Sequence, residues 1–137
     1  MNIIELLEIK KNNFEKIKSI ADQQEKLVDD GLMQDYLQLM AKREHLKNEI
    51  DADDKKYRFV LEQADRKERE MAKSINREIS EVIESIMDID KRIEKLVNEK
   101  KKEVLDEIKG LKKGRTAVKG YGQKKGQVQP RFIKTVG

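Results

Sequence analysis

The strongest constraint on the fold is a run of apolar side chains between residues 75 and 96. They recur at alternating spacings of four and three residues, and this heptad pattern places them along one side of an α-helix. The run consists of Ile75, Ile79, Val82, Ile86, Ile89, Ile93 and Leu96. Because this side is apolar over its whole length, the helix needs another helix alongside it. The pattern therefore predicts coiled-coil packing of a helix over residues 74–109.

The first segment of the chain carries a stripe of the same kind. Over residues 2–28, apolar side chains recur at spacings of three, four or seven, which predicts a helix with one apolar face. They are Ile3, Leu7, Phe14, Ile17, Ala21 and Val28. Gly31 follows shortly after, and glycine suits the left-handed position beyond a helix end. We therefore expect the chain to turn back at this residue.

A second helix is predicted over residues 32–62. Its stripe keeps the same spacing, but Arg43 and Asp53 stand at two positions on that face and weaken it. Residues 62–73 are mostly charged and contain no Gly or Pro that would mark a turn. Because the apolar rhythm slips there, we favour a bend before the third helix. One continuous rod over residues 32–109 is the alternative.

Composition supports an all-helical chain. Charged residues make up 42% of the 137 residues and aromatic residues only 4%, a balance typical of long amphipathic helices. A fold that contains a sheet is therefore disfavoured, and the length allows one domain. The predicted fold is all-α: an antiparallel helical hairpin or bundle of three to four long helices over residues 1–109, followed by a flexible basic C-terminal tail.

Few residues offer catalytic or metal-binding chemistry. The chain has no cysteine, which removes disulfides, thiolate metal sites and a cysteine nucleophile. His45 is the only histidine and lies in a charged helical segment. The carboxylates of Asp51, Asp53 and Asp54 would point in different directions on a helix. The segment that contains them also lacks the glycine and the glutamate of a calcium-binding loop. We expect no enzymatic activity, no cofactor and no metal.

The hydropathy of the chain bears on its location. No apolar run approaches the roughly 20 residues that span a membrane. The first residues also lack the basic segment that opens a signal peptide. We therefore expect a soluble, cytoplasmic protein that is not inserted in a membrane.

Charge is divided unevenly along the chain. The net charge is +4, yet residues 109–137 contain nine Lys or Arg, no Asp or Glu, and six of the seven glycines. Residues 1–108 carry 22 basic and 27 acidic groups, so the basic character belongs to the end of the chain. We interpret residues 110–137 as a Gly- and Lys-rich docking segment and tail.

Three uses of this basic segment stay open. It can be solvated and unstructured, as many chain ends are. Its cations could bind phosphates, but the acidic body and the lack of a recognisable nucleic-acid-binding motif disfavour nucleic acid as a partner. We favour protein docking, in which Leu111, Val118 and Tyr121 anchor an apolar contact.

Beyond Leu96 the apolar stripe of the third helix shifts by one residue. The new stripe consists of Val97, Val104, Ile108 and Leu111. Its turns should face a different direction and project from the bundle with the apolar side free. Together with Val118 and Tyr121, the stripe forms the predicted partner-binding site. Packing of the stripe on the first helix is the alternative. Both arrangements occur in turn if the terminal helix covers the partner-binding groove until a partner displaces it.

Four passages of the chain together point to a family. They are the amphipathic first helix, DDGLMQDYLQLMAKREHLKNEID after a short break, the helix IMDIDKRIEKLVNEKKKEVLDEIKGL, and the ending GRTAVKGYG followed by PRFIKTVG. In this order they resemble the flagellar type III export chaperones, of the FliT kind and less closely the FlgN kind. The resemblance implies a cytoplasmic helical bundle that binds a filament-cap or hook-junction subunit and delivers it to the export gate. It also implies that the last helix recognises the partner and that Tyr121 contacts the gate.

A second class of function stays open. The seam over residues 75–96 could pair between two copies of the chain, which would make the protein a homodimeric coiled-coil adaptor or structural spacer. A prefoldin-like holdase is disfavoured, because no stretch with a period of two predicts the strand hairpins of that class.

Overall fold

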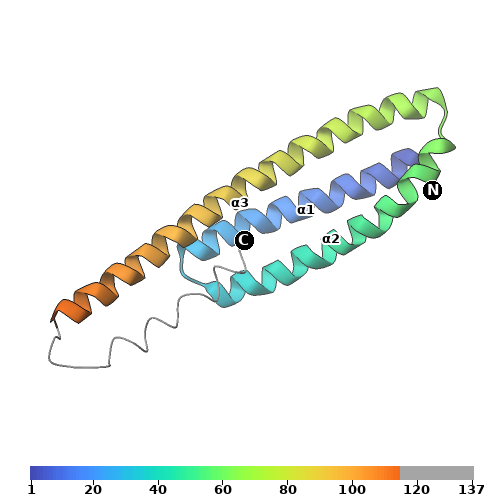
Figure 1. Ribbon diagram of the computed structural model, residues 1–137. Coiled ribbons are helices and arrows are strands. Elements are labelled where there is room, and N and C mark those ends of the chain that lie inside the picture. Colours follow the sequence, from blue (N-terminus) through green and yellow to red (C-terminus); the bar gives the residue numbers. More distant parts are fainter. Residues whose placement is uncertain (115–137) are drawn as a thin grey trace.

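The computed structural model of the chain describes residues 1–114, with side chains as far as Leu111. This part of the chain folds into three helices, α1 (Ile3–Asp29), α2 (Met33–Glu62) and α3 (Arg66–Gly114), and contains no strand (Figure 1). The all-α prediction is confirmed, with three helices over the described residues. The predicted flexible tail lies outside them, apart from its first residues, which continue α3.

The first turn forms where the sequence predicts it. Gly31 has a φ of 76°, the left-handed conformation that glycine adopts without strain. The backbone N–H of Leu32 donates to the carbonyl of Leu27 at 2.8 Å, and the N–H of Gly31 donates to the carbonyl of Val28 at 3.1 Å. This pair of bonds is the Schellman arrangement that satisfies the last carbonyls of a helix. Gly31 therefore ends α1 and turns the chain back.

The second turn is shorter than predicted and lies earlier. The bend between the second and third helices is confirmed and the continuous rod is excluded, but α3 begins at Arg66 and not at residue 74. The N–H of Glu68 donates to the Asp65 carboxylate at 2.8 Å, and the N–H of Asp65 donates to the Glu68 carboxylate at 3.2 Å. This reciprocal cap starts the helix within the charged stretch. Its charged residues then face solvent while Ala72 is buried.

The end of α3 also differs from the prediction. The helix was expected to end at Lys109, yet it runs through Gly110 to Gly114. Gly110 has space around its Cα and an ordinary helical backbone, so it is tolerated inside the helix. The predicted boundary between bundle and docking segment therefore falls within one continuous helix.

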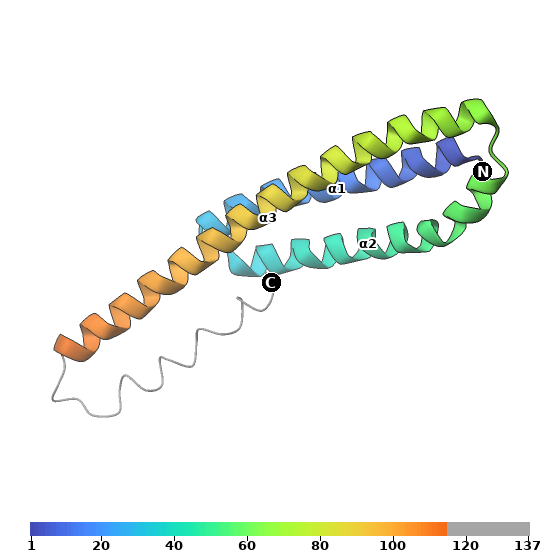
Figure 2. The same cartoon turned by 45° about the horizontal axis from the view of Figure 1, so that its top comes forward.

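The three helices are arranged with α1 in the middle. Both α2 and α3 pack closely along α1, whereas the backbones of α2 and α3 approach each other less closely (Figures 1 and 2). Three apolar clusters follow one another along the bundle, and residues of all three helices take part in each. The fold is thus a three-helix bundle with one shared core, in which α2 and α3 meet through side chains and not through close backbone packing.

The heptad seam of α3 faces this core. Five of its residues are buried, namely Ile75, Ile79, Ile86, Ile89 and Ile93, while Val82 and Leu96 are partly buried. On α1 the predicted stripe is buried as well, apart from Phe14, which is partly exposed. The faces predicted for the two helices are therefore confirmed. The interlocking of side chains that defines a coiled coil stays a prediction.

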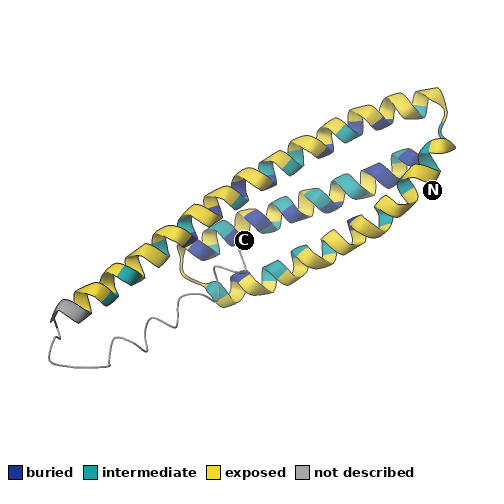
Figure 3. Cartoon of the chain, viewed as in Figure 1, coloured by how far each residue is buried: buried dark blue, intermediate teal, exposed yellow. Residues whose placement is uncertain are grey.

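One end of α3 extends beyond the other two helices. The Lys100 ammonium donates to the carbonyl of Asp29 at 3.0 Å, where α1 ends. Residues 101–114 continue past this point for about 20 Å, at roughly 1.5 Å per residue, and Figure 3 shows mostly exposed residues as far as Leu111. None of the helices over residues 1–114 has an apolar stretch long enough to cross a membrane.

Candidate binding surfaces

Val97 belongs to the core, so its assignment to a free stripe is wrong and the alternative, packing toward the first helix, holds for this residue. Only 2% of its surface is exposed, and it lies in a buried cluster with Val28 of α1 and Tyr36 of α2. Val97 is close to the last position of α3 that both other helices still flank. Its role is therefore to hold α3 against the bundle.

The next three predicted residues lie on the projecting end of α3. Val104 and Leu111 are 44% and 41% exposed, and Ile108 is partly exposed. We call Val104, Ile108 and Leu111 the projecting stripe. Val104 follows Val97 by seven residues, so the stripe continues the face that is buried further up the helix. Because α1 ends alongside Lys100, packing of this stripe on α1 is excluded.

The other two predicted residues cannot be placed. Val118 and Tyr121 lie outside the described residues, so their proposed contacts stay predictions. The same holds for the idea that the terminal segment covers a groove until a partner displaces it. Within residues 101–111, α3 runs straight away from the bundle and covers none of its surface (Figure 1).

A partly buried polar layer links all three helices in the half of the bundle where α1 ends. Both terminal guanidinium nitrogens of Arg43 donate to the Asp90 carboxylate, each at 2.8 Å, and one of them also donates to the side-chain oxygen of Gln24 at 2.9 Å. Gln24 is fully buried, and its amide nitrogen donates to the carbonyl of Tyr36 at 3.3 Å. The layer joins α2 directly to α3, as does a hydrogen bond from the Asn76 side-chain amide to the Tyr57 hydroxyl at 3.2 Å.

The electrostatics of this layer follow from its geometry. The hydrogen bond to Asp90 raises the pKa of Arg43 further above its ordinary value, so the guanidinium stays charged at any physiological pH. Burial raises the pKa of the neighbouring Tyr36 phenol. A bidentate pair between Arg and a carboxylate has one preferred geometry, so the layer favours one alignment of α2 against α3.

Sequence reasoning located only part of this layer. Arg43 was recognised as a polar residue on the inner face of the second helix, and it does lie on that face. Gln24 stands on the α1 stripe, three residues after Ala21 and four before Val28. That position was the available signal for a buried polar partner. Asp90 gave no signal, because it lies beside the seam of α3 and not on it.

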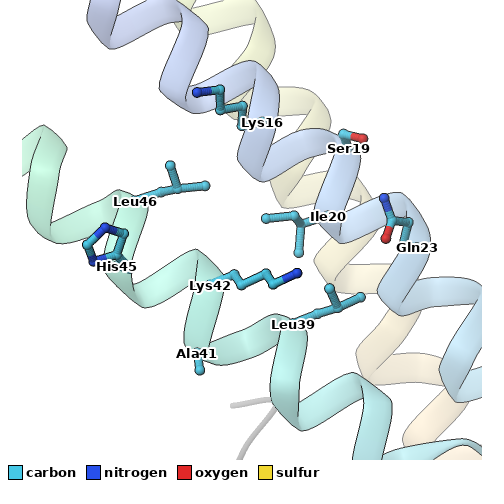
Figure 4. A pocket seen from close by; sticks show the side chains of 9 residues that line it. All are labelled: Lys16, Ser19, Ile20, Gln23, Leu39, Ala41, Lys42, His45 and Leu46. Carbon is cyan, nitrogen blue, oxygen red and sulfur yellow. The ribbon is translucent and has the colours of Figure 1, made fainter.

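An apolar groove runs between α1 and α2, and Figure 4 shows the side chains that line it. Its volume is about 630 Å³. The lining residues are Lys16, Ser19, Ile20 and Gln23 of α1 and Leu39, Ala41, Lys42, His45 and Leu46 of α2. The side chains of Ile20, Leu39 and Leu46 point into the gap between the helices (Figure 4). We call this surface the α1–α2 groove.

A second groove lies on the other side of α2, where α2 and α3 diverge above α1. Its volume is about 540 Å³, and Phe14, Ile83 and Met87 are among its apolar residues. Its rim carries charges of both signs, and the Lys10 ammonium pairs with the Asp54 carboxylate at 2.8 Å. These charges partly neutralise one another, so this groove favours neither sign of partner.

The residues considered for catalysis and metal binding lie on the surface of α2. His45 is exposed, and its Nε2 atom is 3.1 Å from the Glu49 carboxylate one turn away. Asp51 and Asp54 line the second groove, where Asp54 pairs with Lys10. Over the described residues, no cluster of three or more His, Cys, Asp or Glu side chains has the geometry to hold a metal ion.

Comparisons of the chain with models of known families, with curated proteins and with solved structures find no match. The resemblance to flagellar export chaperones therefore stays a prediction. The features that bear on function are the projecting stripe, the polar layer and the two grooves.

Proposed function

We propose that the protein is a chaperone that binds a helical segment of another protein on the projecting end of α3. One observation carries this proposal: the projecting stripe continues the buried face of α3 beyond the ends of α1 and α2. A helix laid against Val104, Ile108 and Leu111 would occupy the position that α1 occupies further up the bundle. The partner would thus extend the bundle by three to four turns.

The exposed area of this stripe suits binding that can be reversed. Full burial of a Val, Leu or Ile side chain contributes roughly 1.5–3 kcal/mol. Since the three side chains are already partly covered, their burial would contribute on the order of 2–3 kcal/mol in total. Such a contribution anchors a partner only together with further contacts. A chaperone that must later release its partner needs an interface of this kind.

The resemblance in the sequence suggests the class of partner. On that basis, the bound segment belongs to a flagellar filament-cap or hook-junction subunit, and the complex forms in the cytoplasm before delivery to the type III export gate. Val118 and Tyr121 would then add contacts to the subunit or to the gate. An apolar face on a helix, with no catalytic group required, is what recognition of an amphipathic helix demands.

The alternative function, a homodimeric adaptor, finds less support. That proposal used the seam over residues 75–96 to pair two copies, and in this structure α1 of the same chain lies against that seam. Pairing through it would require α3 to leave the bundle and expose several isoleucines. The projecting stripe is the part of the α3 face that stays open to a partner without such a rearrangement.

The proposal is tested by calorimetric titration of the full chain with purified filament-cap and hook-junction subunits. The informative variant is Val104→Gln with Ile108→Gln. It removes the apolar contact but keeps the helix, because glutamine favours helix. The matched control is Lys102→Gln with Asp106→Gln. Both control positions are exposed, lie on the opposite side of the helix at the same spacing, and together leave the net charge unchanged.

We expect one of these subunits to bind and the Val104→Gln, Ile108→Gln variant to bind it at least tenfold more weakly, while the control binds like the unchanged chain. Equal binding by both variants would show that the projecting stripe is not the interface. Failure of every subunit to bind the unchanged chain would remove the flagellar assignment.

A further inference from the structure

We infer that the α1–α2 groove is a second docking surface, and that its partner is a short amphipathic helix whose apolar stripe is flanked by acidic side chains. This inference does not depend on the function proposed for the end of α3. It rests on the shape of the groove, on its apolar floor and on the sign of the charges around it.

The floor of the groove supplies an apolar contact of helical dimensions. Ile20 comes from α1, and Leu39 and Leu46 come from α2, with all three side chains turned into the gap (Figure 4). All three are partly exposed and not buried in the core. The lining residues span two turns of each helix. A third helix seated between α1 and α2 would complete the packing of these side chains in the way that α3 completes the other side of α1.

The charges that line the groove are all of one sign. Lys16 stands on the α1 side, and Lys42 extends from α2 toward α1 (Figure 4). No Asp or Glu is among the lining residues. Like most lysines of the described chain, neither has a carboxylate within ion-pair distance, and the acidic group beside the groove is Glu49, 3.1 Å from the lining residue His45.

The two lysines of the lining determine the sign of the partner. Long lysine side chains beside an apolar floor keep their ammonium groups in water and attract carboxylates at the rim of an interface. The second groove differs, because Lys10 and Asp54 neutralise each other at its edge. The α1–α2 groove is therefore selective for an acidic helix, and this selectivity should weaken as salt screens the charges.

The test uses two synthetic peptides of 14 residues and the full chain. One peptide carries leucines along one face and glutamates on either side of them, and the other carries lysines in place of the glutamates. Binding is followed through the methyl resonances of Ile20, Leu39 and Leu46 and through fluorescence anisotropy at several salt concentrations. We expect the acidic peptide to shift these methyl resonances and to bind at least tenfold more tightly than the basic one.

Two double variants separate the groove from the overall charge. Lys16→Glu with Lys42→Glu changes the rim, and we expect at least a tenfold loss of affinity for the acidic peptide. Lys55→Glu with Lys73→Glu changes the net charge equally at exposed positions that do not line the groove. This control should bind nearly as well as the unchanged chain.

Three results would overturn the inference. Equal losses of affinity for the acidic peptide in both double variants would show that net charge alone, and not the groove, determines binding. Shifts at Val104 and Ile108 in place of the groove methyls would move the acidic helix to the end of α3. A dimer of the chain that dissociates when Lys16 and Lys42 are reversed would show that a second copy occupies the groove.

Discussion

Val97 and Val104 are both valines on the same face of α3, one heptad apart. Yet 2% of the surface of Val97 is exposed, against 44% of that of Val104. The difference comes from the neighbouring helices and not from α3 itself. At Val97 the end of α1 and the start of α2 still flank α3, whereas α1 has ended by Lys100. An apolar stripe thus marks a face that needs cover, and the lengths of the other helices decide whether the chain supplies it.

The comparison also separates stability from binding. Residues of the seam, together with Val97, hold the bundle together, so their loss should unfold it. Residues of the projecting stripe contact little within the described chain, so their loss should affect a partner and leave the fold intact. Four measurements can break or sharpen this distinction.

The largest effect is expected from Val97→Ala. Removing two buried methyl groups from a packed cluster should lower the free energy of unfolding by about 2–3 kcal/mol, including the cavity that remains. Val104→Ala should change it by less than about 0.5 kcal/mol, because the side chain is exposed and alanine favours helix. Urea unfolding followed by circular dichroism measures both. Equal losses for the two variants would mean that the projecting end is also part of the core.

A smaller loss is expected when the polar layer is broken. Asp90→Asn removes the carboxylate that accepts hydrogen bonds from both terminal nitrogens of Arg43. Because the side chain of Asp90 is 40% exposed, water partly replaces these hydrogen bonds in the variant. We expect a loss of about 1–2 kcal/mol in the same unfolding experiment. The matched control is Glu25→Gln, whose partner Arg92 is on the surface, with an effect near zero. If Asp90→Asn were as mild as this control, the layer would not hold α2 to α3.

A gain that stays local is expected from Gly110→Ala. A methyl group at this position meets no atom within 4 Å, and alanine favours helix over glycine by roughly 1 kcal/mol. Amide hydrogen exchange over residues 104–111 should slow by up to about fivefold. Exchange at the buried residues of α3 should not change. Equal slowing in both regions would show that the projecting end unfolds together with the bundle.

The smallest effect at neutral pH comes from the Tyr36 phenol. Burial raises its pKa in the folded protein above the unfolded value of about 10. The resulting stability is fully present below that unfolded value and is lost as pH rises through the higher folded pKa. Unfolding between pH 9 and 11 should therefore show a loss that Tyr36→Phe removes. A loss of the same size in both proteins would assign the alkaline step to other groups.

The sequence carried the main outline of this fold. The heptad seam predicted the inner face of α3, and Gly31 predicted the first turn, because spacing and backbone conformation are local properties. The start of α3 was missed because its cap, formed by Asp65 and Glu68, lies within a charged stretch that carries no Gly or Pro. Local signals of this kind are easily overlooked when charge dominates the segment.

The candidate surfaces were harder to predict than the helices. Val97 was grouped with the free stripe because spacing along one helix says nothing of where its neighbours end. The α1–α2 groove depends on Ile20, Leu39 and Leu46 meeting across two helices, which only the packing of α2 on α1 determines. The bond from Arg43 to Asp90 likewise joins residues that are 47 positions apart.

The central claim is that the projecting stripe binds a partner helix that the bundle itself does not supply. Amide hydrogen exchange of the full chain, alone and with the filament-cap or hook-junction subunit that titration identifies, tests it most directly. The account predicts slower exchange over residues 101–111 in the complex and no change around Ile89 and Ile93. A complex in which residues 101–111 exchange as fast as in the free protein would contradict it.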